Sequence, residues 1–150
     1  MPIEIKKGDI FKQPVEAIVN PVNCDGVMGA GLSKKFKEKF PDNFSCYRRK
    51  CVKGQLKPGI MCVTIPINDV DKQLIINFPT KDKWSNPSKL EYVSKGLDSL
   101  LQTIYDHEIK SIAIPALGCG LGGLEWKEVK SLIIEKLFVV DNVDIIILEP

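Results

Sequence analysis

The chain has 150 residues, of which 44% are hydrophobic and 27% are charged, and its formal net charge is +2. These values are typical of a single globular domain with one core, so we treat residues 1–150 as one domain. No apolar stretch approaches the roughly 20 residues that a membrane helix needs, and residues 1–6 lack the apolar segment of a signal peptide. We therefore expect a cytoplasmic protein with no membrane contact.

Few residues in the chain are suited to metal binding or thiol chemistry. Five cysteines and one histidine are present, and no two cysteines form a CxxC pair. An odd number of cysteines without such pairs favours free thiols. His107 lies near the end of a helical pattern and is expected to cap a surface turn. We therefore predict neither a metal site nor a histidine-based nucleophilic triad.

The N-terminal third of the chain predicts two short strands followed by a helix. The strands are expected at 3–5 and 15–19, and Pro21 is expected to close the second one. A glycine-rich loop follows at 23–31. Apolar residues then recur every fourth position, as on one face of a helix: Leu32, Phe36 and Phe40.

The middle of the chain predicts a second helix and two more strands. Pro41 breaks the first helix, and the second one is expected to stop at Gly54. Strands at 61–65 and 74–77 are separated by a polar turn at 68–72. The residues expected on the apolar side of the second helix are Phe44, Tyr47, Cys51 and Val52.

The C-terminal half alternates helices with buried strands. Pro87 is expected in the first turn of a long helix, and strands are expected at 111–115 and 144–149 around a glycine-rich loop at 118–123. Strands that alternate with helices indicate an α/β fold with a largely parallel sheet covered on both faces. Apolar positions on the two helices are Leu90, Val93, Leu97, Leu100, Leu101 and Ile104, then Trp126, Val129, Ile133 and Leu137.

Lys81 follows a strand that must leave the sheet at Pro79, because proline cannot extend the hydrogen-bond ladder. In open α/β sheets, ligands bind at the carboxyl ends of the strands. Lys81 could therefore face a substrate, and the alternative is an ordinary solvated lysine.

Two glycine-rich loops, 28–31 and 118–123, each follow a strand and precede a helix, where backbone N–H groups can hold phosphate. The second loop satisfies GxGxxG, but it lies on the last crossover, whereas the dinucleotide fingerprint lies on the first. Both loops could instead close on one diphosphate, or their glycines could serve only tight turns. Asp9 could accept a hydrogen bond from a base amine, or serve only its own turn.

The basic residues are concentrated in one segment. Residues 34–57, which we call the basic segment, hold nine basic and two acidic side chains and so carry +7, which leaves −5 on the rest of the chain. Such a face could attract a polyanion, and the alternative is a solvated pair of helices.

Several of these segments together resemble a macrodomain, and the match covers nearly the whole chain. The resemblance is greatest to the branch that holds the terminal ADP-ribose glycohydrolases and the DarG antitoxins. It implies a three-layer α/β/α fold with a mixed, mostly parallel sheet. The segments that carry it are Gly8–Ile10, Ala17–Asn23, Met28–Gly31, Asn77–Trp84 and Ile114–Trp126.

The resemblance also implies a role for individual residues. Lys81 would be catalytic at C1 of the distal ribose, either as an unprotonated nucleophile or as a cation that stabilises the leaving group. Asp9 and Ile10 would bind adenine, Asn23 would contact the distal ribose, and the two glycine loops would wrap the diphosphate. The implied ligand-binding residues are Asp9, Ile10, Asn20, Asn23, Met28, Gly29, Ala30, Gly31, Thr80, Gly118, Cys119, Gly120, Leu121, Gly122 and Gly123.

One position departs from part of this branch. The protein-directed glycohydrolases carry an aspartate where Gly122 stands, and that aspartate is thought to act with the lysine. Its absence favours the DNA-directed group.

The resemblance thus implies a glycosidase that removes ADP-ribose from thymidine in single-stranded DNA and reverses a DarT-type toxin, without a cofactor. The alternatives are a hydrolase of protein-linked ADP-ribose or O-acetyl-ADP-ribose, and a non-catalytic ADP-ribose reader. The expected partners are ADP-ribose, ADP-ribosylated single-stranded DNA and a DarT-type toxin, and the expected state is a monomer. DarG antitoxins carry a further C-terminal region, so we expect a domain excised from a longer chain.

Overall fold

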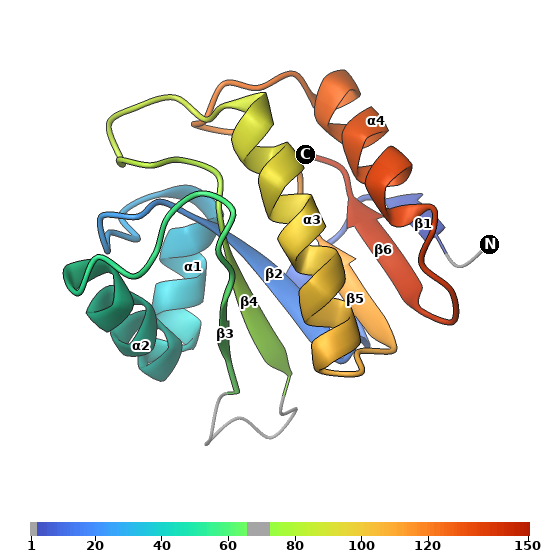
Figure 1. Cartoon of the computed structure of the whole chain (residues 1–150), viewed down its shortest axis with the longest axis horizontal. Coiled ribbons are helices and arrows are strands. Elements are labelled where there is room, and N and C mark those ends of the chain that lie inside the picture. The colour runs from blue at the N-terminus through green and yellow to red at the C-terminus, as the bar shows by residue number, and fades with distance from the viewer. Residues whose placement is uncertain (1–2, 66–72) are drawn as a thin grey trace.

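The computed structural model describes residues 3–65 and 73–150, and the polar turn predicted at 68–72 lies outside them. One six-stranded sheet has the strand order β1-β6-β5-β2-β4-β3 (Figure 1). Every neighbouring pair is parallel except β3 and β4, which confirms the predicted mixed sheet. The strands are β1 (Ile3–Lys6), β2 (Ala17–Val22), β3 (Cys62–Thr64), β4 (Leu74–Pro79), β5 (Ser111–Ile114) and β6 (Asp144–Leu148).

Helices cover both faces of the sheet, as predicted (Figure 1). Because successive side chains of a strand point to opposite faces, Ala17 and Val19 pack with α3 and α4, whereas Ile18 packs with Phe36 of α1. The helices are α1 (Gly31–Lys39), α2 (Pro41–Val52), α3 (Leu90–Asp106) and α4 (Trp126–Leu137), with a short 3₁₀ helix η1 (Ile10–Lys12) after β1. No helix in the described ranges is both long enough and apolar enough to cross a membrane.

The prediction that Pro21 closes its strand is wrong. β2 continues to Val22, and Pro21 pairs with Phe78 of β4. The N–H of Thr80 donates to the carbonyl of Val22 (2.9 Å), so the even-numbered residues of β2 bond with β4 and Pro21 faces β5. The ladder between β2 and β5 already stops at Ile18. Pro21 therefore costs the sheet no hydrogen bond.

Three further details of the helices differ from the predictions. Pro87 is not in the first turn of α3, which begins at Leu90, because the extended stretch before it is tied to the second glycine loop by a bond from Ser88 N to Gly122 O (3.0 Å). Leu90 is itself exposed. Val52 is 75% exposed, because α2 ends there and Leu56 enters the core instead. His107 caps α3 at the surface, as predicted.

Candidate functional site

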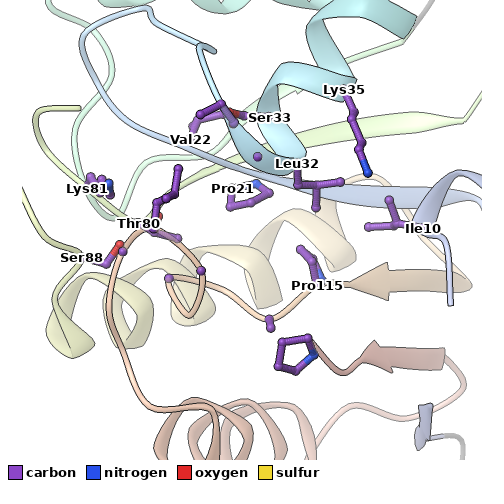
Figure 2. Close-up of a pocket in the computed structure, with 18 of the residues that line it drawn as sticks. Ile10, Pro21, Val22, Leu32, Ser33, Lys35, Thr80, Lys81, Ser88 and Pro115 are labelled. Carbon is purple, nitrogen blue, oxygen red and sulfur yellow. The ribbon is translucent and has the colours of Figure 1, made fainter. Parts of the chain in front are cut away.

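A cleft of about 1070 Å³ lies at the carboxyl ends of the parallel strands. Its wall includes Val22 at the end of β2, Thr80 after β4, Pro115 after β5 and Leu148 at the end of β6. Figure 2 shows Thr80, Lys81 and Ser88 at one end of this cleft and Ile10 and Lys35 at the other. This is the edge at which open α/β sheets bind ligands.

The first glycine loop, residues 28–31, leads directly into α1. Ala30 is the N-cap of α1 and supplies no side-chain hydrogen bond to the helix end. Within the described residues, the N–H groups of Gly31, Leu32 and Ser33 have no partner, and all three residues line the cleft. Free N–H groups and the positive end of a helix dipole together favour an anion at this position.

The second glycine loop, residues 118–123, is held by its own turns. The bond from Leu124 N to Gly118 O (2.9 Å) closes it, and Gly123 N donates to Gly120 O (3.2 Å). The N–H groups of Gly120, Leu121 and Gly122 make no bond in the part of the chain that the structure describes, and these residues line the cleft. Consecutive free N–H groups of this kind form an anion-binding nest.

Gly122 sits where no side chain fits. A Cβ atom built there would overlap Ser88 Oγ and would lie 2.6 Å from the carbonyl oxygen of Gly118. The Ser88 hydroxyl is buried beneath the loop and has no hydrogen-bond partner among the described residues. The aspartate that the resemblance implies at this position in protein-directed glycohydrolases would therefore have no room in this loop.

Lys81 is half-buried in the cleft wall, on the loop that follows β4. Its Nζ donates to the carbonyl oxygen of Trp84 at 3.4 Å. The two ion pairs found within 3–65 and 73–150 join Lys6 to Glu4 and Lys136 to Asp98, so Lys81 has no carboxylate within 4 Å there. Its amine is thus free to meet a ligand.

The Lys81 loop is braced against the segment that precedes the first glycine loop. Asp25 Oδ2 accepts a hydrogen bond from Trp84 N (2.8 Å), and Cys24 N donates to Asp82 O (2.9 Å). Sequence reasoning missed Asp25 and the cleft position of Trp84, because both depend on contacts between distant segments. Trp84 did end the segment Asn77–Trp84 that carries the resemblance, but nothing in the sequence indicated that its ring would be exposed in the cleft wall.

Asp9 and Phe11 line the opposite end of the cleft, and Lys35 reaches it from α1. Asp9 caps η1 by accepting a bond from Phe11 N at its Oδ1 atom (2.9 Å). Its other carboxylate oxygen has no partner among the described residues. The two roles that the sequence left open for Asp9 are therefore compatible, because one oxygen serves the turn and the other remains available to accept a hydrogen bond.

Most of the predicted site residues line the cleft, but Asn20, Met28, Cys119 and Gly123 do not. Asn20 is fully buried, and its Nδ2 donates to Asn77 Oδ1 (3.0 Å) and contacts Met28 Sδ (3.8 Å). Met28 is itself part of the core. The predicted residues that line the cleft are Asp9, Ile10, Asn23, Gly29, Ala30, Gly31, Thr80, Lys81, Gly118, Gly120, Leu121 and Gly122.

Asn23 lines the cleft, but its side chain is largely engaged in shaping its own loop. Its Oδ1 accepts bonds from Asp25 N (3.0 Å) and from the Tyr47 hydroxyl (2.8 Å), and its Nδ2 donates to Val27 O (2.8 Å). Burial raises the pKa of Tyr47, so its hydroxyl stays protonated and donates. Of the side-chain amide of Asn23, only one N–H remains to contact a sugar.

The two cysteines nearest the glycine loops are poor nucleophiles. Burial is the largest cause that raises the pKa of Cys24 to about 12, and the neighbouring Cys51 thiol and the carboxylates of Asp82 and Asp25 add to it. Burial alone raises the pKa of Cys119. Both thiols are therefore protonated at neutral pH, and Lys81 is the better candidate for chemistry in the cleft. No group of three or more metal-binding side chains gathers in the described ranges.

Comparisons with known proteins agree with this geometry. Residues 19–133 match the family described as Macro domain. The solved macrodomain of Thermus aquaticus DarG is 42% identical, with a TM-score of 0.93 over 99% of this chain and 98% of that one. Thermosipho africanus DarTG, solved in complex with ADP-ribose, is 33% identical, with a TM-score of 0.90 over 95% of this chain and 40% of that one.

A curated Thermus aquaticus relative, a "DNA ADP-ribosyl glycohydrolase", is 43% identical over 96% of this chain. The chain spans about 40% of the length of the curated relatives of this kind that it matches. The match to the family and the identity to a whole solved macrodomain lead to one conclusion: the chain belongs to the macro domain family, within the group that contains the DarG macrodomains.

Proposed function

We propose that this domain binds ADP-ribose and removes it from thymidine in single-stranded DNA. The observation that carries the proposal is the arrangement of one cleft, in which two loops of free N–H groups lie between Lys81 at one end and Asp9 at the other. A diphosphate held by the loops would direct adenine toward Asp9 and the distal ribose toward the Lys81 amine. The solved relative with ADP-ribose and the relatives' names support this substrate.

The reaction breaks the bond between C1 of the distal ribose and the thymine nitrogen. As a nucleophile, the unprotonated Lys81 amine would attack C1 while thymine leaves with its electron pair and takes up a proton, which gives a glycosylamine. The bond between C1 and the ring oxygen would then break as a proton passes from the nitrogen to that oxygen, and water would hydrolyse the resulting imine to release ADP-ribose and the free amine. As a cation, Lys81 would instead stabilise the departing thymine anion while water attacks C1. Reduction with cyanoborohydride during turnover, followed by peptide mapping, distinguishes the two roles, because only the first forms an imine at Lys81 in every turnover and so attaches ADP-ribose chiefly to that residue.

Two features favour DNA over protein as the substrate. The tight contact of Gly122 with Ser88 and Gly118 leaves no room for the second carboxylate that the resemblance implies in protein-directed glycohydrolases. The lysines and arginines of the basic segment on α1 and α2 are exposed, apart from the half-buried Lys50, and can attract a DNA strand. We further propose that the domain works in the cytoplasm as part of an antitoxin to a DarT-type toxin, as the DarTG relative suggests.

An oligonucleotide that carries ADP-ribose on thymidine tests the proposal. The wild-type domain should release ADP-ribose, and Lys81→Ala should lower kcat by about 100-fold or more, which is typical when a catalytic group is lost. Binding of free ADP-ribose, measured by calorimetry, should change by only a few-fold. Lys83→Ala is the matched control, because Lys83 is an exposed lysine of the same loop that does not line the cleft.

Three results would contradict this assignment. Release from a glutamate-linked peptide but not from DNA would make the domain a protein-directed hydrolase. Tight binding of ADP-ribose without release from either conjugate would make it a reader. Full activity of Lys81→Ala would remove the catalytic role of Lys81.

A further inference from the structure

Trp84 is a large aromatic residue that the fold leaves uncovered in the cleft wall. It is 62% exposed and lies three residues after Lys81. Two other exposed apolar residues, Val27 (41%) and Leu121 (76%), line the same cleft. Exposed aromatic and aliphatic groups that share a cleft usually mark a surface that a ligand covers.

The main chain of Trp84 is held close to the Lys81 amine. Its N–H donates to Asp25 Oδ2 (2.8 Å), and its carbonyl accepts a bond from Lys81 Nζ (3.4 Å). The indole ring therefore belongs to a residue whose carbonyl oxygen contacts the Lys81 amine. A group joined to the sugar carbon on which Lys81 acts would lie within reach of this ring.

A cationic side chain lies near Asp25, which holds the main chain of Trp84 through a hydrogen bond. Arg48 of α2 packs against Gly26, where an added Cβ would lie 3.4 Å from Arg48 Cγ, and Gly26 adjoins Asp25. Arg48 is exposed and belongs to the basic segment. Proteins that bind single strands combine aromatic rings, on which bases stack, with basic groups that follow the phosphates.

We propose that Trp84 is a stacking platform for a nucleobase of single-stranded DNA at the Lys81 end of the cleft, with Arg48 contacting a neighbouring phosphate. This inference rests on the proposed function and adds its specificity determinant. A base gains from stacking on the indole, whereas a glutamate side chain on a protein has no aromatic face to stack. Trp84 therefore favours ADP-ribose that is joined to DNA over ADP-ribose that is joined to protein.

Substitution of Trp84 tests the platform. On ADP-ribosylated oligonucleotide, Trp84→Ala and Trp84→Leu should lower kcat/KM by about 5-fold to 150-fold, mostly through KM, because stacking on one base supplies this range. Trp84→Phe keeps an aromatic face and should stay within a few-fold of wild type. The affinity for free ADP-ribose should be unchanged in all three variants. Tyr105→Ala is the control, because Tyr105 is a similarly exposed aromatic (56%) on α3 that does not line the cleft.

A second measurement needs no turnover. Trp84 and Trp126 are the only tryptophans, so in a Trp126→Phe background the fluorescence reports Trp84 alone. An unmodified thymidine oligonucleotide should quench this fluorescence, and Arg48→Ala should weaken the binding of the oligonucleotide and its dependence on salt. Quenching without release of ADP-ribose would sustain the platform and remove the proposed function.

Other outcomes overturn the platform. Release of ADP-ribose without any quenching would do so, as would unchanged kinetics in both Trp84→Ala and Trp84→Leu. A parallel loss of free ADP-ribose binding in these variants would also do so, because it would show that Trp84 only shapes the ADP-ribose site.

Discussion

Both glycine loops present to the cleft backbone N–H groups without partners among the described residues, but the two loops are stabilised in different ways. The first loop ends in a helix, and its free N–H groups are those of the first turn of α1. The second loop is closed by its own hydrogen bonds, and α4 begins only at Trp126, beyond its last glycine. Its shape depends on close packing against Ser88 rather than on a helix.

This difference indicates what glycine does at each site. In the second loop Gly122 is required by contact, since any side chain meets Ser88 and the carbonyl of Gly118. In the first loop Gly31 has no atom within 4 Å of an added Cβ, and its positive φ of 62° is the only constraint. We therefore expect substitutions to harm the second loop more than the first.

The largest effect is expected from Gly122→Ala. The added Cβ would lie 2.6 Å from a backbone oxygen, which cannot turn aside as a flexible side chain can, so the loop must move. Such overpacking costs about 1–3 kcal/mol of unfolding free energy. Displacing two or more N–H donors should weaken ADP-ribose binding by about 100-fold, as judged by calorimetry.

Gly120→Ala is the matched control for that substitution. Gly120 lies in the same loop, but its φ is outside the left-handed region and nothing lies within 4 Å of an added Cβ. The unfolding temperature of the Gly120→Ala variant should stay within about 1 °C of wild type. Equal melting temperatures for the two variants would mean that the second loop adjusts freely and that Ser88 does not hold its shape.

The second-largest effect is expected in the reactivity of the two cysteines nearest the glycine loops, Cys24 and Cys119. Negative charges of Asp82 and Asp25 add to burial at Cys24, which raises its pKa to about 12, whereas burial acts alone at Cys119. A higher pKa means less thiolate at a given pH, and the thiolate is the reactive form. At about pH 8.5, iodoacetamide should label Cys119 faster than Cys24 in the native protein, as followed by peptide mass spectrometry.

Unfolding in urea supplies the control for the labelling. It removes the burial at both sites, so the two thiols should then react at similar rates. Faster labelling of Cys24 than of Cys119 in the native protein would contradict the assigned environments. It would mean that the hydrogen bond between Trp84 N and Asp25 breaks readily and exposes Cys24.

The order of strands and helices follows from patterns that are local in sequence. Apolar residues at helical spacing predicted α1 to α4, and short apolar runs predicted the strands around them. Pro21 was misjudged because whether a proline ends a strand depends on which neighbour its missing N–H faces. That property belongs to the pairing of β2 with β4 and β5, which no short window of sequence contains.

The cleft was predictable only in part for the same reason. The glycine loops and Lys81 stand at strand ends, and parallel strands bring their ends together. Asn20 looked equally suitable, but its amide faces the core, where it bonds to Asn77. Ser88 and Asp25 carry no sequence signal at all, because each acts through a contact with a loop more than thirty residues away.

The smallest effect is expected from Gly31→Ala. Left-handed backbone costs an L residue about 1 kcal/mol more than glycine, and no steric contact adds to this cost. For a chain of this length the unfolding temperature should fall by about 2–4 °C. Gly29→Ala in the same loop should melt like wild type, because its φ is outside that region and its nearest neighbour, Val27 Cγ1, lies at an ordinary 3.5 Å. If Gly31→Ala is as damaging as Gly122→Ala, then the first loop also relies on close contacts, and the contrast between the loops is wrong.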